Sequence, residues 1–132
     1  MTHDFALNAL GDERFVSLTT FRKTGEEVST PVWIARDGDA LVATTPQGSG
    51  KVKRLRNSGR VVLRPCDRMG KVAPGAVSVS AQAEIVAGSD VEDQLTVIFL
   101  AKYKLEYRIF MFIERLGKKG RQDRVMLRIT TA

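Results

Sequence analysis

Residues 27–63 read EVSTPVWIARDGDALVATTPQGSGKVKRLRNSGRVVL, and the pattern of this stretch decides the fold. A β-rich run over 28–36 leads into Asp37-Gly38, a dipeptide typical of two-residue hairpins, and a second run follows over 39–45. Pro31 lies inside the first run. Because proline has no N–H to donate to a sheet, we expect this strand to lie at an edge or to carry a bulge, where a ligand could approach.

The rest of the chain adds four more strands and four helices. Alternating apolar and polar residues predict strands over 14–21, 60–66, 76–86 and 124–130. Helical patterns cover 5–10, 51–57, a segment from the capping pair Ser89 and Glu92 to about residue 103, and a segment from 105 to near Gly117. Six short strands with helices at the periphery predict a mainly β protein built as a small closed barrel.

Length and composition restrict the class of protein. A chain of 132 residues suits a single domain over 1–132. No apolar run approaches the roughly 18 residues that span a bilayer, and no secretory signal pattern opens the chain, so we expect a cytoplasmic protein without a membrane partner. With Cys66 and His3 as the single cysteine and histidine, an internal disulfide, a zinc site and histidine-assisted hydrolase chemistry are all disfavoured.

Positive charge is concentrated in one part of the chain. The net charge is +6, yet residues 51–71 alone hold eight basic residues and one acid, Asp67. Such a segment attracts anions, either the phosphates of a small cofactor or a nucleic-acid backbone, unless it is simply a solvated basic face. Single-stranded nucleic acids are bound by aromatic side chains placed among basic ones, and residues 51–71 contain no Phe, Tyr or Trp. We therefore expect no nucleic-acid partner.

The loop before residue 51 has the features of an anion site. Ser49 lies where the N-cap of the helix belongs, Gly48 and Gly50 let a ligand approach the backbone, and Lys51 adds an ammonium group. This is not a Walker A loop, because Thr45 stands where its first glycine would be and Val52 replaces the Ser or Thr that holds Mg²⁺. Ordinary capping beside surface lysines is the alternative interpretation.

The order of these motifs resembles a known family over residues 13–130. The segments STPVW (29–33), SGKVKRL (49–55) and PCD (65–67), with AVSVSAQAEIV (76–86) and RVMLRI (124–129), are similar to the flavin/deazaflavin split-barrel oxidoreductases. These include the pyridoxamine-phosphate-oxidase-like proteins, and the short branch that uses the deazaflavin coenzyme F-420 is the most similar. The resemblance implies an FMN-binding split-barrel-like fold and a homodimer with the cofactor in a groove between two barrels.

Cofactor-binding residues follow from the resemblance by position. Phosphate would be held by Ser49, Gly50, Lys51 and Lys53. The ring would be lined by Ser29, Pro31, Val32 and Trp33, with Thr44, Thr45 and Gln82 as polar contacts. Arg54, Arg56 and Arg60 are candidates for the anionic tail of F-420, or are solvated surface.

One departure bears on the choice of cofactor. The FMN-using oxidases usually have Arg-Lys where this chain has Gly50-Lys51, which favours F-420 and leaves FMN as the alternative. No catalytic side chain and no metal ligand is assigned. Hydride transfer needs few reactive side chains, because the cofactor itself supplies the reactive group.

Several residues of the candidate site have a purely structural alternative. Trp33 could fill the barrel, and core or surface positions are expected for Tyr103 and Tyr107 rather than closure of a substrate pocket. Cys66 is expected to be a small buried apolar residue. The stripe of Leu105, Ile109, Phe112 and Ile113 is expected in the core or at a dimer interface.

Two functions remain open for a cofactor-binding barrel. The first is an oxidoreductase that passes a hydride from reduced F-420, or from FMN, to an unsaturated small organic substrate. The second is a non-catalytic flavin or deazaflavin binding protein.

Overall fold

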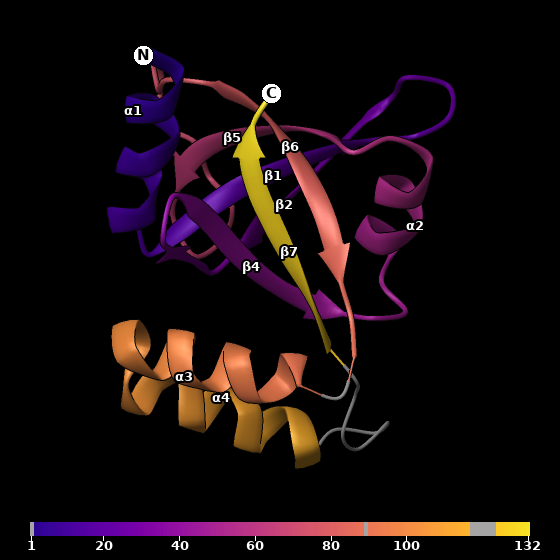
Figure 1. The fold of residues 1–132 in the computed structure, drawn as a ribbon. Helices are drawn as coiled ribbons and strands as arrows, with labels where there is room; N and C mark the ends of the chain where they lie inside the picture. Colours follow the sequence, from indigo (N-terminus) through magenta and orange to yellow (C-terminus); the bar gives the residue numbers. More distant parts are fainter. Residues whose placement is uncertain (1, 89, 117–123) are drawn as a thin grey trace.

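The computed structural model describes residues 2–88, 90–116 and 124–132, and seven of its segments are strands of one antiparallel sheet (Figure 1). The order in the sheet is β2-β1-β5-β6-β7-β4-β3. The strands are β1 (Phe15–Phe21), β2 (Glu27–Val32), β3 (Ile34–Asp37), β4 (Ala40–Pro46), β5 (Arg60–Cys66), β6 (Val79–Val86) and β7 (Arg124–Thr131).

The predicted strand over 28–36 is two strands that lie at opposite edges of the sheet. The chain leaves β2 at Val32, passes through Trp33 and enters β3 at Ile34, where it pairs with β4 instead of β1. The expectation of six strands in a closed barrel is therefore wrong, since this sheet has seven strands and its two edge strands are joined by the chain and not by a ladder. The edge position inferred from Pro31 is confirmed.

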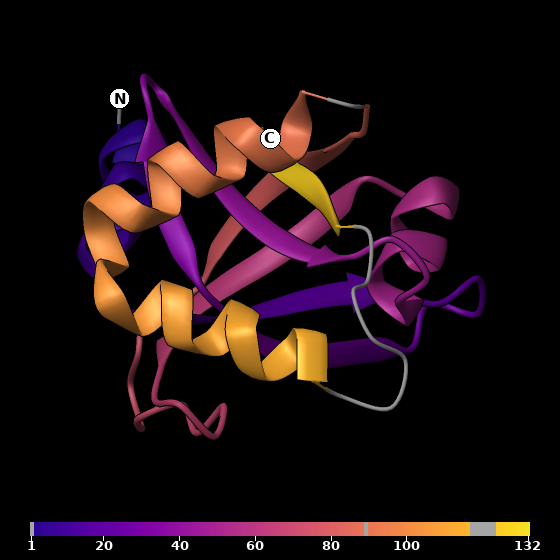
Figure 2. The ribbon, with the colours of Figure 1, turned by 90° about the horizontal axis from the view of Figure 1, so that it is seen from below.

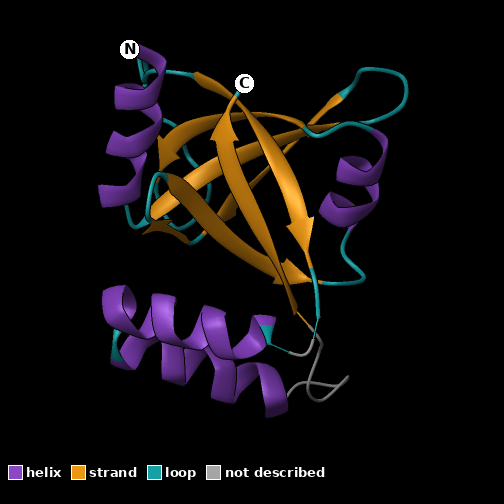
Figure 3. Ribbon diagram, viewed as in Figure 1, coloured by secondary structure: helices purple, strands orange, loops and turns teal. Residues whose placement is uncertain are grey.

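The curved sheet encloses an apolar interior. Inward-facing residues such as Val16, Leu18 and Leu63 are fully buried there. Helix α1 (Thr2–Ala9), followed by a 3₁₀ turn over Leu10–Asp12, and helix α2 (Gly50–Asn57) lie at opposite ends of the curved sheet (Figure 3). Each adds apolar side chains to this interior, and Val52 and Leu55 are the inward pair expected for α2.

Two further helices pack as a pair against the outer surface of the sheet. Helix α3 (Val91–Tyr103) places Leu95 and Phe99 in a second buried cluster with Val42 and Met126, and helix α4 (Leu105–Leu116) runs beside α3 (Figure 1). The expected Ser89 cap lies outside the described residues, and Asp90 at the N-cap makes no side-chain bond to the helix. Gly117, the expected end of α4, also lies outside them.

The joint between α3 and α4 is a single residue. Lys104 has φ 54° and ψ −129°, a conformation that L-amino acids rarely adopt. This turn folds α4 back along the sheet. Across the described ranges no helix is long and apolar enough to span a bilayer.

Candidate functional site

The first turn of α2 is ordered by two hydroxyl groups. Ser49 Oγ accepts a hydrogen bond from the Val52 N–H at 3.4 Å, which confirms Ser49 as the N-cap. Thr45 Oγ1 at the end of β4 donates to the same oxygen at 3.1 Å. The cap therefore joins the end of β4 to the start of α2, and free N–H groups of the helix lie at this corner.

Lys51 follows in the first turn of α2 and is half-buried. Burial lowers the pKa of its ammonium group, and the nearby Arg54 and Arg124 lower it further. Among the residues that the structure describes, no carboxylate forms an ion pair with Lys51. A half-buried cation near two others is costly unless an anion joins it, so this corner is suited to anion binding.

A pocket of about 460 Å³ opens beside Lys51. Six residues predicted from the sequence line it together: Pro31, Val32, Trp33, Thr44, Thr45 and Lys51. They come from the end of β2, the β2–β3 junction, the end of β4 and the start of α2. The volume lies within the range of small-molecule and cofactor sites.

Aromatic rings form one wall of this pocket. The Trp33 ring stacks on Tyr103, with centroids 4.6 Å apart and planes 12° apart, and it also contacts Phe110 at 5.0 Å and Tyr107 at 5.8 Å. Trp33 therefore lies between the sheet and the helix pair, and does not fill the barrel. Tyr107 is buried and lines the pocket, whereas Tyr103 is buried behind Trp33.

Polar contacts hold Tyr103 in this place. Its hydroxyl accepts a hydrogen bond from the Ile34 N–H at 3.1 Å and donates to the Arg14 carbonyl at 2.7 Å. Burial raises the pKa of Tyr103 to about 12, so the phenol stays protonated. The neighbouring Lys102 Nζ donates to the carbonyl oxygens of Gly11, Glu13 and Ile34, which ties α3 to the sheet.

The remaining predicted residues do not line the pocket. Ser29 Oγ lies 2.6 Å from Thr19 Oγ1 on β1. Arg54 Nε donates to Thr20 Oγ1 at 2.6 Å, and its guanidinium occupies the space beside Gly50. Arg60 Cζ lies 4.3 Å from the centroid of the Phe21 ring. Lys53, Arg56 and Gln82 are exposed.

More than half of the pocket wall was not predicted from the sequence. Arg124 donates from Nε to Thr44 Oγ1 at 3.0 Å, which places its guanidinium at the polar end. The rest of the wall is supplied by Phe15, Pro46, Arg68 and the α4 residues Glu106, Tyr107, Ile109, Phe110 and Ile113. The stripe on α4 was visible in the sequence, but it was expected in the core or at an interface. Instead Leu105, Ile109, Phe112 and Ile113 are 51–66% exposed in the monomer, so the core alternative is wrong.

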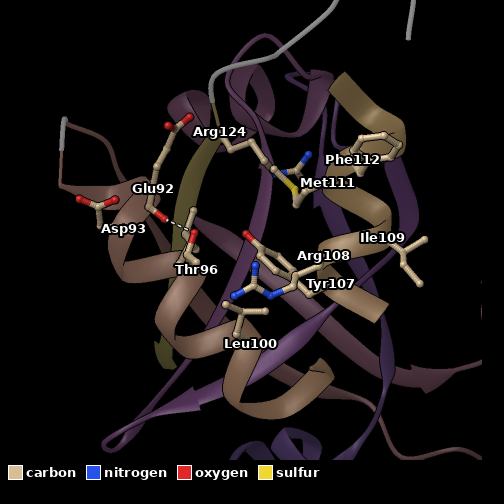
Figure 4. Close-up of a pocket in the computed structure, with 11 residues that line it drawn as sticks. Glu92, Asp93, Thr96, Leu100, Tyr107, Arg108, Ile109, Met111, Phe112 and Arg124 are labelled. Atoms are coloured by element: carbon tan, nitrogen blue, oxygen red, sulfur yellow. Dashed lines mark hydrogen bonds between the residues drawn. The ribbon is translucent and has the colours of Figure 1, made fainter. Parts of the chain in front are cut away.

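A second cavity of about 600 Å³ lies between α3 and α4 (Figure 4). Figure 4 shows Thr96 and Leu100 on α3 across from Tyr107 and Met111 on α4, with Glu92 and Asp93 near one end. None of the cofactor-binding residues predicted from the sequence lines it, although Tyr107, Ile109 and Phe112 do. The described residues also contain no cluster of His, Cys, Asp and Glu that could hold a metal ion.

The chain combines a mainly antiparallel β fold with a basic, aromatic-walled pocket of the size that small molecules occupy. The family model of pyridoxamine 5'-phosphate oxidase matches residues 3–132. The chain therefore belongs to this family of flavin-binding, oxidoreductase-type proteins.

Solved structures share the fold at low sequence identity. A conserved hypothetical protein from Mycobacterium tuberculosis is 21% identical with a TM-score of 0.62, over 99% of this chain and 81% of that one. An F420 reductase is 18% identical with a TM-score of 0.61, over 95% and 92%. An FAD-binding protein from Mesorhizobium loti is 17% identical with a TM-score of 0.60, over 96% and 85%. No curated protein matches the chain.

Proposed function

We propose that the chain is an oxidoreductase that binds reduced coenzyme F-420 in the pocket beside Lys51 and delivers its hydride to an unsaturated organic substrate. The observation that carries this proposal is the position of Lys51. Its half-buried ammonium group lacks an ion-pair partner within the described residues, and it lines a pocket with an aromatic wall. An anionic group attached to a flat ring system satisfies both features. Similarity to an F420 reductase agrees with this ligand class.

The residues present fit such a cofactor. Lys51 and Arg124 would meet its phosphate, with Thr45 and Ser49 at the same corner. Pro31, Val32 and Trp33 would lie along its ring. When bound, the coenzyme would supply the hydride at carbon 5 of that ring. The protein's own contribution is to orient the ring and to exclude water with apolar walls.

Residues that the family resemblance placed near the phosphate divide into two groups. Lys51 lines the pocket, while Lys53 is exposed on another side of α2 and Arg54 is bonded to Thr20. We therefore assign the phosphate contact to Lys51 and give Lys53 no direct role.

A homodimer is part of the proposal. Ile109, Phe112 and Ile113 form an exposed apolar face on α4, and two of them also line the pocket. Apolar faces of this kind mark interfaces. Light scattering should give twice the monomer mass, and Phe112→Glu should lower it while Val97→Glu, at an exposed position on α3, should not.

Titration of the purified protein with F-420 and with FMN, followed by absorbance, tests the function. We expect F-420 to bind at micromolar concentration and more tightly than FMN. Binding of neither overturns the proposal, and tighter binding of FMN transfers it to the FMN-dependent alternative. Steady-state oxidation of the reduced cofactor with unsaturated acceptors then separates an enzyme from a storage protein.

A further inference from the structure

The pocket has positive charge at two separate ends. Lys51 and Arg124 lie at the end formed by β4 and α2, where Arg124 Cζ is 5.7 Å from the centroid of the Phe110 ring. Arg68 lies at the other end, where its Nη2 is 3.6 Å from Glu106 Oε2 in the first turn of α4. Phe110, the ring beside Arg124, follows Glu106 by four residues, which is a rise of roughly 6 Å along the helix.

The carboxylate at the second end is already paired. Glu106 is bound by Arg14, which does not line the pocket. Its contact with Arg68 is long, and the Arg68 side chain is 75% exposed. Ion pairs of this kind contribute about 0–1 kcal/mol, so Arg68 can leave Glu106 at little cost.

Arg68 has donor capacity left for a ligand. Within the described ranges its other recorded contact is with the Phe15 ring, 6.0 Å from Cζ to the centroid. A guanidinium carries five N–H donors in a planar fork that matches a carboxylate. Phe15 itself lines the pocket, so the free side of this fork borders the same cavity.

The backbone that carries Arg68 is held in place. Asp67 Oδ1 accepts hydrogen bonds from the N–H groups of Met69 at 2.8 Å and Lys71 at 2.9 Å. Gly70 has φ 87° and lies against Pro31, where an added Cβ would come within 3.3 Å of Pro31 Cδ. Figure 2 shows this loop after β5 beside the start of α4. The loop thus presents Arg68 next to a residue of the pocket wall.

We propose that this pocket takes a flat, conjugated organic acid as its substrate, and that Arg68 binds the acid group. The inference deepens the proposed function, because the cofactor phosphate uses the Lys51 end and leaves the Arg68 end for the substrate. Between the two ends the walls are mainly apolar and aromatic, which suits a planar body with a single charged group. A cationic substrate would meet three basic side chains and one carboxylate that is already paired.

Isothermal titration calorimetry of the protein loaded with F-420 provides the test. The probes are 4-nitrobenzoate and its neutral counterpart 4-nitrobenzamide. With F-420-loaded protein we expect the acid to bind at least tenfold more tightly than the amide. Arg68→Met should abolish this preference, Arg68→Lys should keep part of it, and Lys71→Met, an exposed cation on the same loop, should leave it unchanged.

Two results would overturn the proposal. One is equal binding of acid and amide by the unaltered protein. The other is a preference that survives Arg68→Met, in particular one that Lys51→Met removes. The same titrations without cofactor, carried out in the Lys51→Met background, keep the test independent of the proposed function. There the acid preference should still be lost on Arg68→Met, whether or not F-420 or FMN binds.

Discussion

Helices α2 and α4 are both amphipathic, yet the apolar stripe of α2 is buried and that of α4 is exposed. In α2 the stripe of Val52 and Leu55 is buried in the interior of the sheet. In α4 the stripe from Leu105 to Ile113 stays exposed, while Tyr107 on another face of the same helix is buried against Trp33. Periodicity in a sequence therefore predicts a helix and its apolar face, but it does not predict what covers that face.

Leucine-to-alanine changes in the two helices should show the largest difference. Leu55 is 6% exposed, so Leu55→Ala should lower the free energy of unfolding by about 2–5 kcal/mol, because it removes buried methyl groups and leaves a cavity. Leu105 is 66% exposed and lies outside both pockets, so Leu105→Ala should lower the free energy of unfolding by less than about 0.5 kcal/mol. Urea denaturation at two protein concentrations measures both. Equal losses would show that α4 is covered in solution as completely as α2.

Lysine-to-alanine changes within α2 compare its pocket side with its solvent side. Lys51→Ala should weaken binding of F-420 by about 1.5–3 kcal/mol, the value of a charge-assisted hydrogen bond. Lys53→Ala removes an exposed ammonium of the same helix and should change the affinity by less than about 0.5 kcal/mol. Isothermal titration calorimetry of both variants with F-420 measures the two affinities. A larger effect at Lys53 would place the phosphate on the outer face of α2.

Removal of the Tyr103 hydroxyl tests how the end of α3 is held to the sheet. Tyr103→Phe keeps the ring on Trp33 but leaves the buried Ile34 N–H without its partner, and should cost about 1–3 kcal/mol of stability. Tyr103→Leu, which also removes the stacked ring, should in addition shift the Trp33 emission to longer wavelength. Thermal unfolding and emission spectra provide the readouts. An unshifted spectrum in the leucine variant would contradict the role assigned to stacking.

A pH dependence of stability is expected at Lys102. Burial lowers the pKa of this ammonium group from 10.5 to about 8. Between these values the unfolded chain binds more protons than the folded one, so the contribution of Lys102 to the free energy of unfolding rises with pH from about 8 to 10.5 and is constant below 8. Lys102→Met should lack this rise. Denaturation curves at several pH values test it, and parallel profiles for the two proteins would refute it.

Local signals predicted much of the fold. Asp37-Gly38 marked the β3–β4 hairpin, Pro31 marked an edge strand, and Ser49 marked the start of α2. Each depends on backbone chemistry within a few residues. The break at Trp33 was missed because nothing local shows that the chain exchanges one neighbouring strand for another there.

Only part of the candidate site was predicted from the sequence, because the signals in the sequence are local. Thr44, Thr45 and Lys51 follow one another along a short stretch of chain, so their proximity was visible in the sequence. Arg124 and Phe110 reach the pocket from distant segments, and only the pairing of β7 with β4 and the packing of α4 bring them there. No spacing pattern in the sequence predicts that these distant residues line one pocket.

By itself the sequence determined the local elements: strands from alternation, a hairpin from Asp37-Gly38, and a helix from a serine cap and an apolar pair. Only the tertiary structure decided that one predicted strand is two, that Trp33 stacks outside the apolar interior of the sheet, and that α4 forms a wall of the pocket. The physical reason is range, since hydrogen-bond and capping preferences act between near neighbours in the chain. Pockets and covered faces, in contrast, arise where distant segments bury surface against each other.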